Sequence, residues 1–91
     1  MNDARAVNRR HVGERYELVD GRVFVVEPDT DVCGVALREV GGTVEFVVRG
    51  SVSAGEPVAA LWERRWTVAH GQPVAVWLPT DFTLHDLEPT L

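Results

Sequence analysis

Residues 16–26 read YELVDGRVFVV, and this stretch decides the fold class. Two apolar runs flank Asp20-Gly21, a dipeptide that indicates a β-hairpin because a type I′ turn needs positive φ at both central residues. The run at 23–26 is rich in β-branched and aromatic side chains, which fit a pleated strand better than a helix. The sequence therefore predicts a hairpin that ends at Pro28.

Short apolar segments separated by glycine and proline continue to the end of the chain. They predict strands at about 32–40, 43–49, 74–78 and 82–87. Gly34 inside the first of these indicates a bulge or bend, Pro79 ends the third, and residues 50–56 are expected to form a loop. Residues 57–69 are compatible with a short helix or a strand, and we expect a strand up to Trp62 followed by a turn through Arg64 and Arg65.

This spacing predicts an all-β fold, specifically a small OB-like five-stranded barrel with an additional N-terminal β-hairpin. Residues 14–91 form the single barrel domain, and residues 1–13, which contain four basic side chains and one aspartate, form a flexible basic arm. Closure of the sheet would remove its edges and let each alternating strand bury one face.

The composition of the chain argues against several classes of function. The chain has 91 residues, a net charge of −5, one cysteine and no lysine. An acidic domain is a poor ligand for nucleic acid, and a lone cysteine makes neither an intramolecular disulfide nor a cysteine-based zinc site. No stretch has the roughly 18 apolar residues that span a bilayer, and no secretory signal is recognised, so we expect a cytoplasmic protein without membrane insertion.

Signatures of catalysis and of cofactor binding are missing. The sequence has no glycine-rich phosphate loop, no nucleophile elbow and no His-x-x-x-His pair, so we expect no enzyme, no cofactor and no metal. A small metal-dependent enzyme stays as a third class; it requires His70 and His85 to converge with Asp81 or Asp86.

The strongest candidate site is Trp62-Glu63-Arg64-Arg65-Trp66. Two arginines between two tryptophans can hold an anion or stack on a planar ligand. A second interpretation packs both tryptophans in the core, with the arginines covering its edge. The residues predicted to bind a ligand are Arg49, Arg64, Arg65 and Trp66.

Residues 31–91 resemble a TOBE domain, the OB-like β domain of many ABC-importer ATPase subunits. The resemblance rests on Val32-Cys33-Gly34-Val35, on the strand at 43–48 after Gly41-Gly42, and on Gly71 to Pro79 leading into Leu84-His85-Asp86. It implies a non-catalytic, transport-associated module that docks on an importer ATPase or senses a small anionic or sugar-like ligand. The chain departs from the oxyanion-binding members of the family because it has no lysine.

The alternative function is a protein–protein interaction module or accessory subunit. Such a module would dock on a partner, or form a homodimer, through an exposed sheet edge.

Overall fold

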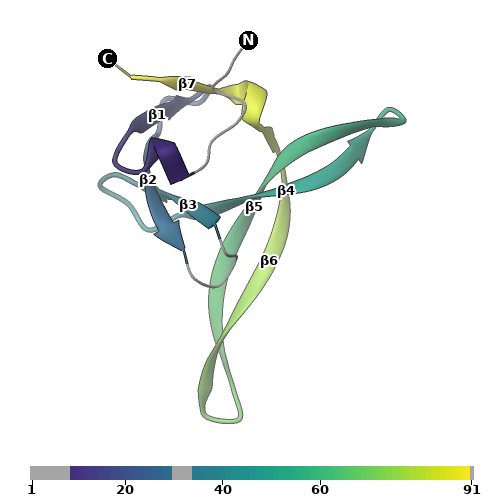
Figure 1. Ribbon diagram of the computed structural model, residues 1–91. Helices are drawn as coiled ribbons and strands as arrows, with labels where there is room; N and C mark the ends of the chain where they lie inside the picture. The colour runs from purple at the N-terminus through teal and green to yellow at the C-terminus, as the bar shows by residue number, and fades with distance from the viewer. Residues whose placement is uncertain (1–8, 30–33, 91) are drawn as a thin grey trace.

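The computed structural model describes residues 9–29 and 34–90 and contains one antiparallel sheet of seven strands (Figure 1). A 3₁₀ turn, η2, spans Arg9–His11, and a second, η3, spans Leu84–Asp86. The strands are β1 (Arg15–Leu18), β2 (Val23–Asp29), β3 (Gly34–Glu39), β4 (Glu45–Ser53), β5 (Glu56–Ala69), β6 (Gln72–Thr83) and β7 (Leu87–Pro89). The expected all-β class is confirmed.

The strand order is β6-β5-β4-β3-β2-β1-β7, so the first six strands form a meander and β7 returns to pair with β1. The three residues of η3 join the two edge strands, β6 and β7, which forces the sheet to curl strongly. The sheet is nevertheless not closed into a barrel. The expected five-stranded barrel is corrected to an open, curled, seven-stranded sheet that includes the N-terminal hairpin.

Two features of the sheet oppose closure. Prolines lie in both edges, at Pro73 and Pro79 in β6 and at Pro89 in β7, and a proline has no N–H to donate to a ladder. The long strand β5 also divides its pairing: Glu56–Arg64 pairs with β4, whereas Ala60–Ala69 pairs with β6 after a register shift between Ala60 and Trp62. As a result the Gln72 end of β6 projects from the body with β5, and its Thr83 end returns to the body, where η3 leads into β7 without pairing of β6 with β7 (Figure 1).

Two hairpins project from the body, and the molecule measures 45 × 33 × 25 Å. One is the β4–β5 hairpin, whose tip is Ala54-Gly55; the other is the β5–β6 hairpin, whose tip is His70-Gly71. All four tip residues have positive φ, between 51° and 81°, as a two-residue type I′ turn requires. The loop expected at 50–56 is therefore reduced to the two-residue turn Ala54-Gly55, with strands on either side. The turn expected at Arg64-Arg65 is wrong, because β5 runs through both residues.

The predicted hairpin at 16–26 is confirmed, although its turn differs. Gly21 has a φ of 97°, Asp20 does not have positive φ, and the Gly21 N–H donates to the Leu18 carbonyl oxygen. The turn is thus a three-residue loop in which only the glycine adopts the left-handed conformation. The expected bulge at Gly34 is not found, since the β2–β3 register is continuous from Phe24↔Glu39 to Asp29↔Gly34. Residues 30–33, including Cys33, lie outside the described part of the chain, as do residues 1–8 of the basic N-terminal segment predicted at 1–13.

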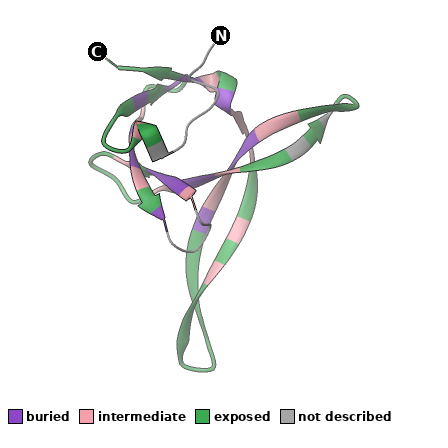
Figure 2. Cartoon of the chain, in the orientation of Figure 1, coloured by how far each residue is buried: buried purple, intermediate pink, exposed green. Residues whose placement is uncertain are grey.

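The core lies on the inner face of the curled sheet, where alternate residues of each strand meet (Figure 2). Phe24 and Phe46 pack with their ring centroids 4.9 Å apart, and the Arg22 guanidinium carbon lies 5.6–5.9 Å from the centroids of these rings and of Phe82. The fully buried side chains are Tyr16, Leu18, Phe24, Val26, Leu37, Phe46, Val47 and Leu61. All of these except Val47 belong to the inner-face core cluster.

Candidate functional site

The four predicted site residues do not converge on one point. Arg64 and Trp66 share the outer face of β5, opposite the core, whereas Arg65 points to the other face, as alternation along a strand requires. Arg49 lies on the outer face of the neighbouring strand β4, where its guanidinium carbon is 5.0 Å from the centroid of the Trp62 ring. The structure therefore brings Arg64 and Trp66 together and separates Arg65 from them.

Arg64 is buried, with 7% of its surface exposed. Its Nη2 lies 2.6 Å from Oδ2 of the buried Asp29, and its Nε lies 3.1 Å from Oε1 of Glu45. Burial by itself lowers the pKa of the guanidinium, but the hydrogen bonds to Asp29 and Glu45 outweigh it and raise the pKa. Arg64 is therefore a charged cross-link between β2, β4 and β5, with its charge already matched by carboxylates.

The three tryptophans of the chain lie outside the core. The guanidinium carbon of Arg64 lies 5.4 Å from the Trp66 ring centroid and 5.6 Å from that of Trp77, so the arginine stacks against both rings. The Trp66 Nε1–H donates to Oε1 of Glu45 at 3.3 Å. The interpretation that placed Trp62 and Trp66 in the core with the arginines around them is wrong: the arginine is buried and Trp66 is 53% exposed.

Arg65 is exposed and bound to its own neighbour on the same face. Its Nε lies 2.9 Å from Oε2 of Glu63, and this hydrogen bond raises the pKa of Arg65. Neither arginine of the Arg64-Arg65 pair presents an unmatched positive charge, which makes the pair a poor anion site.

Exposed apolar side chains gather on the β5–β6 hairpin, which is coloured as exposed over most of its length (Figure 2). We call residues 65–76 the arm, because residues 65–69 of β5 pair with β6 and are beyond the reach of the β4 ladder, which ends at Glu45↔Arg64. Its side chain pairs Trp66↔Ala75 and Val68↔Pro73 form one apolar face, which we call the tryptophan face. The exposed large apolar residues of the hairpin are Trp66, Val68, Val74, Val76 and Leu78.

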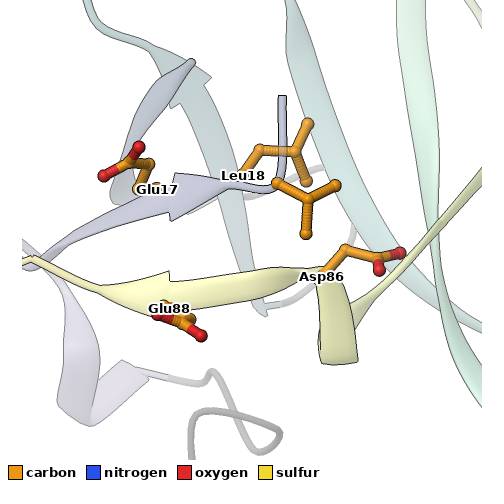
Figure 3. Close-up of a pocket in the computed structure, with 5 residues that line it drawn as sticks. Glu17, Leu18, Asp86 and Glu88 are labelled. Carbon is orange, nitrogen blue, oxygen red and sulfur yellow. The ribbon is translucent and has the colours of Figure 1, made fainter. Parts of the chain in front are cut away.

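Concave surface occurs elsewhere, at the paired strands β1 and β7. Glu17, Leu18, Val19, Asp86 and Glu88 line a shallow depression, and Figure 3 shows the carboxylates of Glu17, Asp86 and Glu88 around it. A second depression is lined by Gly13, Glu14, Arg15, Pro89 and Thr90. Neither contains a predicted ligand residue, and three carboxylates would repel an anion.

A smaller polar cluster joins the N-terminal turn to the core. The Tyr16 hydroxyl lies 3.2 Å from Oε1 of Glu14 and 3.2 Å from Nδ1 of His11, and the last two atoms are 2.9 Å apart. The hydrogen bond from His11 lowers the pKa of Glu14. Burial, and then the charge of Glu14, raise the pKa of Tyr16 above its usual value of about 10.

This cluster predicts a loss of stability in alkali. Because the folded state raises the pKa of Tyr16, its stabilising contribution is complete below pH ~10 and is lost as the pH rises through the folded pKa. Tyr16 is the only tyrosine, so tyrosinate absorbance reports this one group. We expect it to titrate above the value for the urea-unfolded chain. Tyr16→Phe should remove the fall in the urea midpoint that begins as the pH rises above ~10; an equal fall in the variant would contradict this assignment.

The histidines do not meet. His11 contacts Tyr16, His70 forms the tip of the arm, and His85 lies in η3, where its N–H donates to the Thr83 hydroxyl. Asp86 closes the capping box of the same turn by accepting from the Thr83 N–H. Within residues 9–29 and 34–90, no group of three histidine, cysteine, aspartate or glutamate side chains comes close enough to hold a metal ion. The same residues contain no helix of the length and apolarity that crosses a bilayer.

The fold and this surface define the class: an all-β domain built on one open antiparallel sheet, with an apolar hairpin arm projecting from it. Comparisons of the chain with known protein families, with curated proteins and with solved structures found no match. The site must therefore be interpreted from its own chemistry. The signal that sequence reasoning missed was the uninterrupted run without carboxylates from residue 64 to residue 80, between Glu63 and Asp81.

Proposed function

We propose that this chain is a protein-interaction module that docks through the tryptophan face of its β5–β6 arm. The observation that carries the proposal is the position of the three tryptophans: all lie outside the core, and Trp66 and Val68 are 53% and 73% exposed. Tryptophan and arginine are the residues most enriched at the energetic centres of protein interfaces.

The surroundings of Trp66 support the same function. Its ring is held by stacking against Arg64 and by its hydrogen bond to Glu45, so little side-chain freedom is left to lose when a partner binds. Burial of this exposed, already ordered aromatic side chain against a protein partner removes apolar area from water, which favours binding. The edge of β6 is a poorer docking surface than the tryptophan face, because Pro73 and Pro79 have no backbone N–H to donate to an added strand.

Site-specific photo-cross-linking tests the proposal. A photoreactive amino acid at Val68, on the arm, is compared with the same amino acid at Val52, which is 71% exposed on the β4–β5 hairpin. We expect a defined protein adduct, with this chain or with another protein of the source cells, from position 68 and not from position 52. Equal adducts from both positions, or none from position 68, would refute the arm as a docking surface.

The anionic or sugar-like ligand of the sequence analysis stays a prediction, as does docking on an importer ATPase. For the ligand, the double variant Arg64→Ala with Arg65→Ala is an unsuitable test, because Arg64 also anchors the buried carboxylate of Asp29 and the partly buried carboxylate of Glu45. Arg49→Ala, at an exposed guanidinium stacked on Trp62, tests binding without disturbing that network.

A further inference from the structure

The arm exposes apolar side chains on both of its faces. Val74 and Val76 alternate with Ala75 along β6, so they point away from the tryptophan face, and Leu78 continues their row toward the body. We call these three residues the valine face; they are 42%, 40% and 37% exposed. The core cluster includes no residue from 62 to 81, so it covers neither face. A strand at the surface of an antiparallel sheet normally has one apolar and one polar face, which the arm does not.

The exposed area of the two faces indicates how much of the arm a partner covers. The exposed parts of Trp66 and Val68 amount to about 250 Å², and those of the valine face add about 190 Å². A standard interface buries roughly 800 Å² per partner, of which about 450 Å² is apolar. The tryptophan face alone supplies about half of this apolar area. Burial of both faces gives the arm an interface of standard size.

A ribbon that is covered on both faces lies in a cleft of its partner. The two faces of the arm are on opposite sides of one pair of strands, so a flat partner surface would contact only one of them. The leading end is narrow, because the tip is the two-residue turn His70-Gly71. A two-stranded ribbon is marginally stable in water by itself, and the two walls of a cleft would stabilise it.

Charge divides the arm from the rest of the chain and indicates the chemistry of the cleft. All 14 acidic residues lie outside the segment 64–80, and the two arginines of this segment are already paired with carboxylates. Apolar walls therefore suit the arm itself. The body behind it brings a net charge of −5, and Asp81 is exposed where β6 returns to the body. A basic rim around the cleft is complementary to this acidic body.

A second copy of this chain does not have these properties. Its net charge of −5 opposes self-association. The depression at β1 and β7 is shallow and lined by Glu17, Asp86 and Glu88, so it has neither apolar walls nor a basic rim. The charge of the chain thus favours a different protein as the partner.

We propose that the arm inserts into an apolar, basic-rimmed cleft of a different protein, which covers the tryptophan face and the valine face at once; this rests on the proposed function of the arm. Insertion couples the two faces. A charge placed on either face would be buried without a partner charge in the cleft, so it would displace the whole arm. One-sided docking produces no such coupling.

Photo-cross-linking of the full chain in cleared lysate of its source cells tests the insertion. The photoreactive amino acid is placed at Val76, 40% exposed on the valine face, and at the control Val40, 38% exposed between β3 and β4. We expect positions 68 and 76 to form adducts with the same polypeptide, and position 40 to form none. Raising the salt concentration from about 0.05 M to about 0.5 M should lower both yields at least ~3-fold, because it screens the basic rim.

Charge substitutions then test the coupling of the two faces. Val68→Glu should lower the adduct yield at position 76 at least ~10-fold, and Val76→Glu should do the same at position 68. Val52→Glu makes the same substitution at a valine of almost equal exposure to Val68, 71% against 73%, and should leave both yields unchanged. All three variants should keep the circular dichroism and the urea midpoint of the wild type.

Each other outcome overturns a stated part of the proposal. If position 68 forms an adduct but position 76 forms none, if the two positions capture different proteins, or if Val68→Glu leaves the adduct at position 76 unchanged, insertion fails while docking through the tryptophan face stands. Yields that do not depend on salt would refute the basic rim, and adducts with this chain itself would refute a different partner. If position 68 yields no adduct, both the insertion and the proposed function fail.

Discussion

Arg64→Ala is expected to lower the free energy of unfolding by about 3–5 kcal/mol, because it leaves buried carboxylate charge without its matched cation. Asp29 is buried and lies 2.6 Å from the lost guanidinium, and Glu45 lies 3.1 Å from it. Removal of Arg64 also withdraws the stacking contact beneath Trp66 and Trp77 at the base of the arm. Urea denaturation followed by circular dichroism measures the loss.

The neighbouring arginine provides the control. Arg65 also pairs with a glutamate at 2.9 Å, but its side chain is 63% exposed, and exposed ion pairs contribute little. Arg65→Ala should therefore unfold at nearly the wild-type urea concentration. If the two variants lost equal stability, the burial of the Arg64 network would not be the source of its effect.

Phe46→Ala is expected to destabilise the fold by about 3–5 kcal/mol, the usual range for truncation of a buried phenylalanine. Phe46 is 1% exposed and packs against Phe24 and Phe82, with centroid distances of 4.9 and 6.3 Å. Because these contacts join β2, β4 and the end of β6, the cavity would lie where the curled sheet is held together.

Val52→Ala serves as the matched surface control for this substitution. Val52 belongs to the same strand as Phe46 but is 71% exposed on the β4–β5 hairpin, so its truncation should change stability by less than about 0.5 kcal/mol. Thermal and urea unfolding of the two variants give the comparison. A Phe46→Ala variant as stable as Val52→Ala would mean that the inner face of the sheet is not the core.

Local sequence signals predicted the fold class and several strands correctly. The hairpin at 16–26 depends on contacts between near neighbours, and a glycine with positive φ sits where the pattern placed it. Alternation along β5 places Trp62, Arg64 and Trp66 on one face, but a turn was expected through Arg64 and Arg65, and this continuous strand was not predicted. The two type I′ turns were missed because their first residues are Ala54 and His70, and residues other than glycine seldom adopt positive φ, although histidine does so more often than alanine.

The sequence by itself determined a β protein with valine-rich strands, an acidic surface and a carboxylate-free segment at 64–80. Only the tertiary structure decided that the sheet stays open and that Arg64, not the tryptophans, is the buried member of its segment. The physical reason is that alternation fixes which side chains share a face but not which face is covered. That choice depends on Asp29 and Glu45, which reach Arg64 from strands distant along the chain and supply the charges that make its burial favourable.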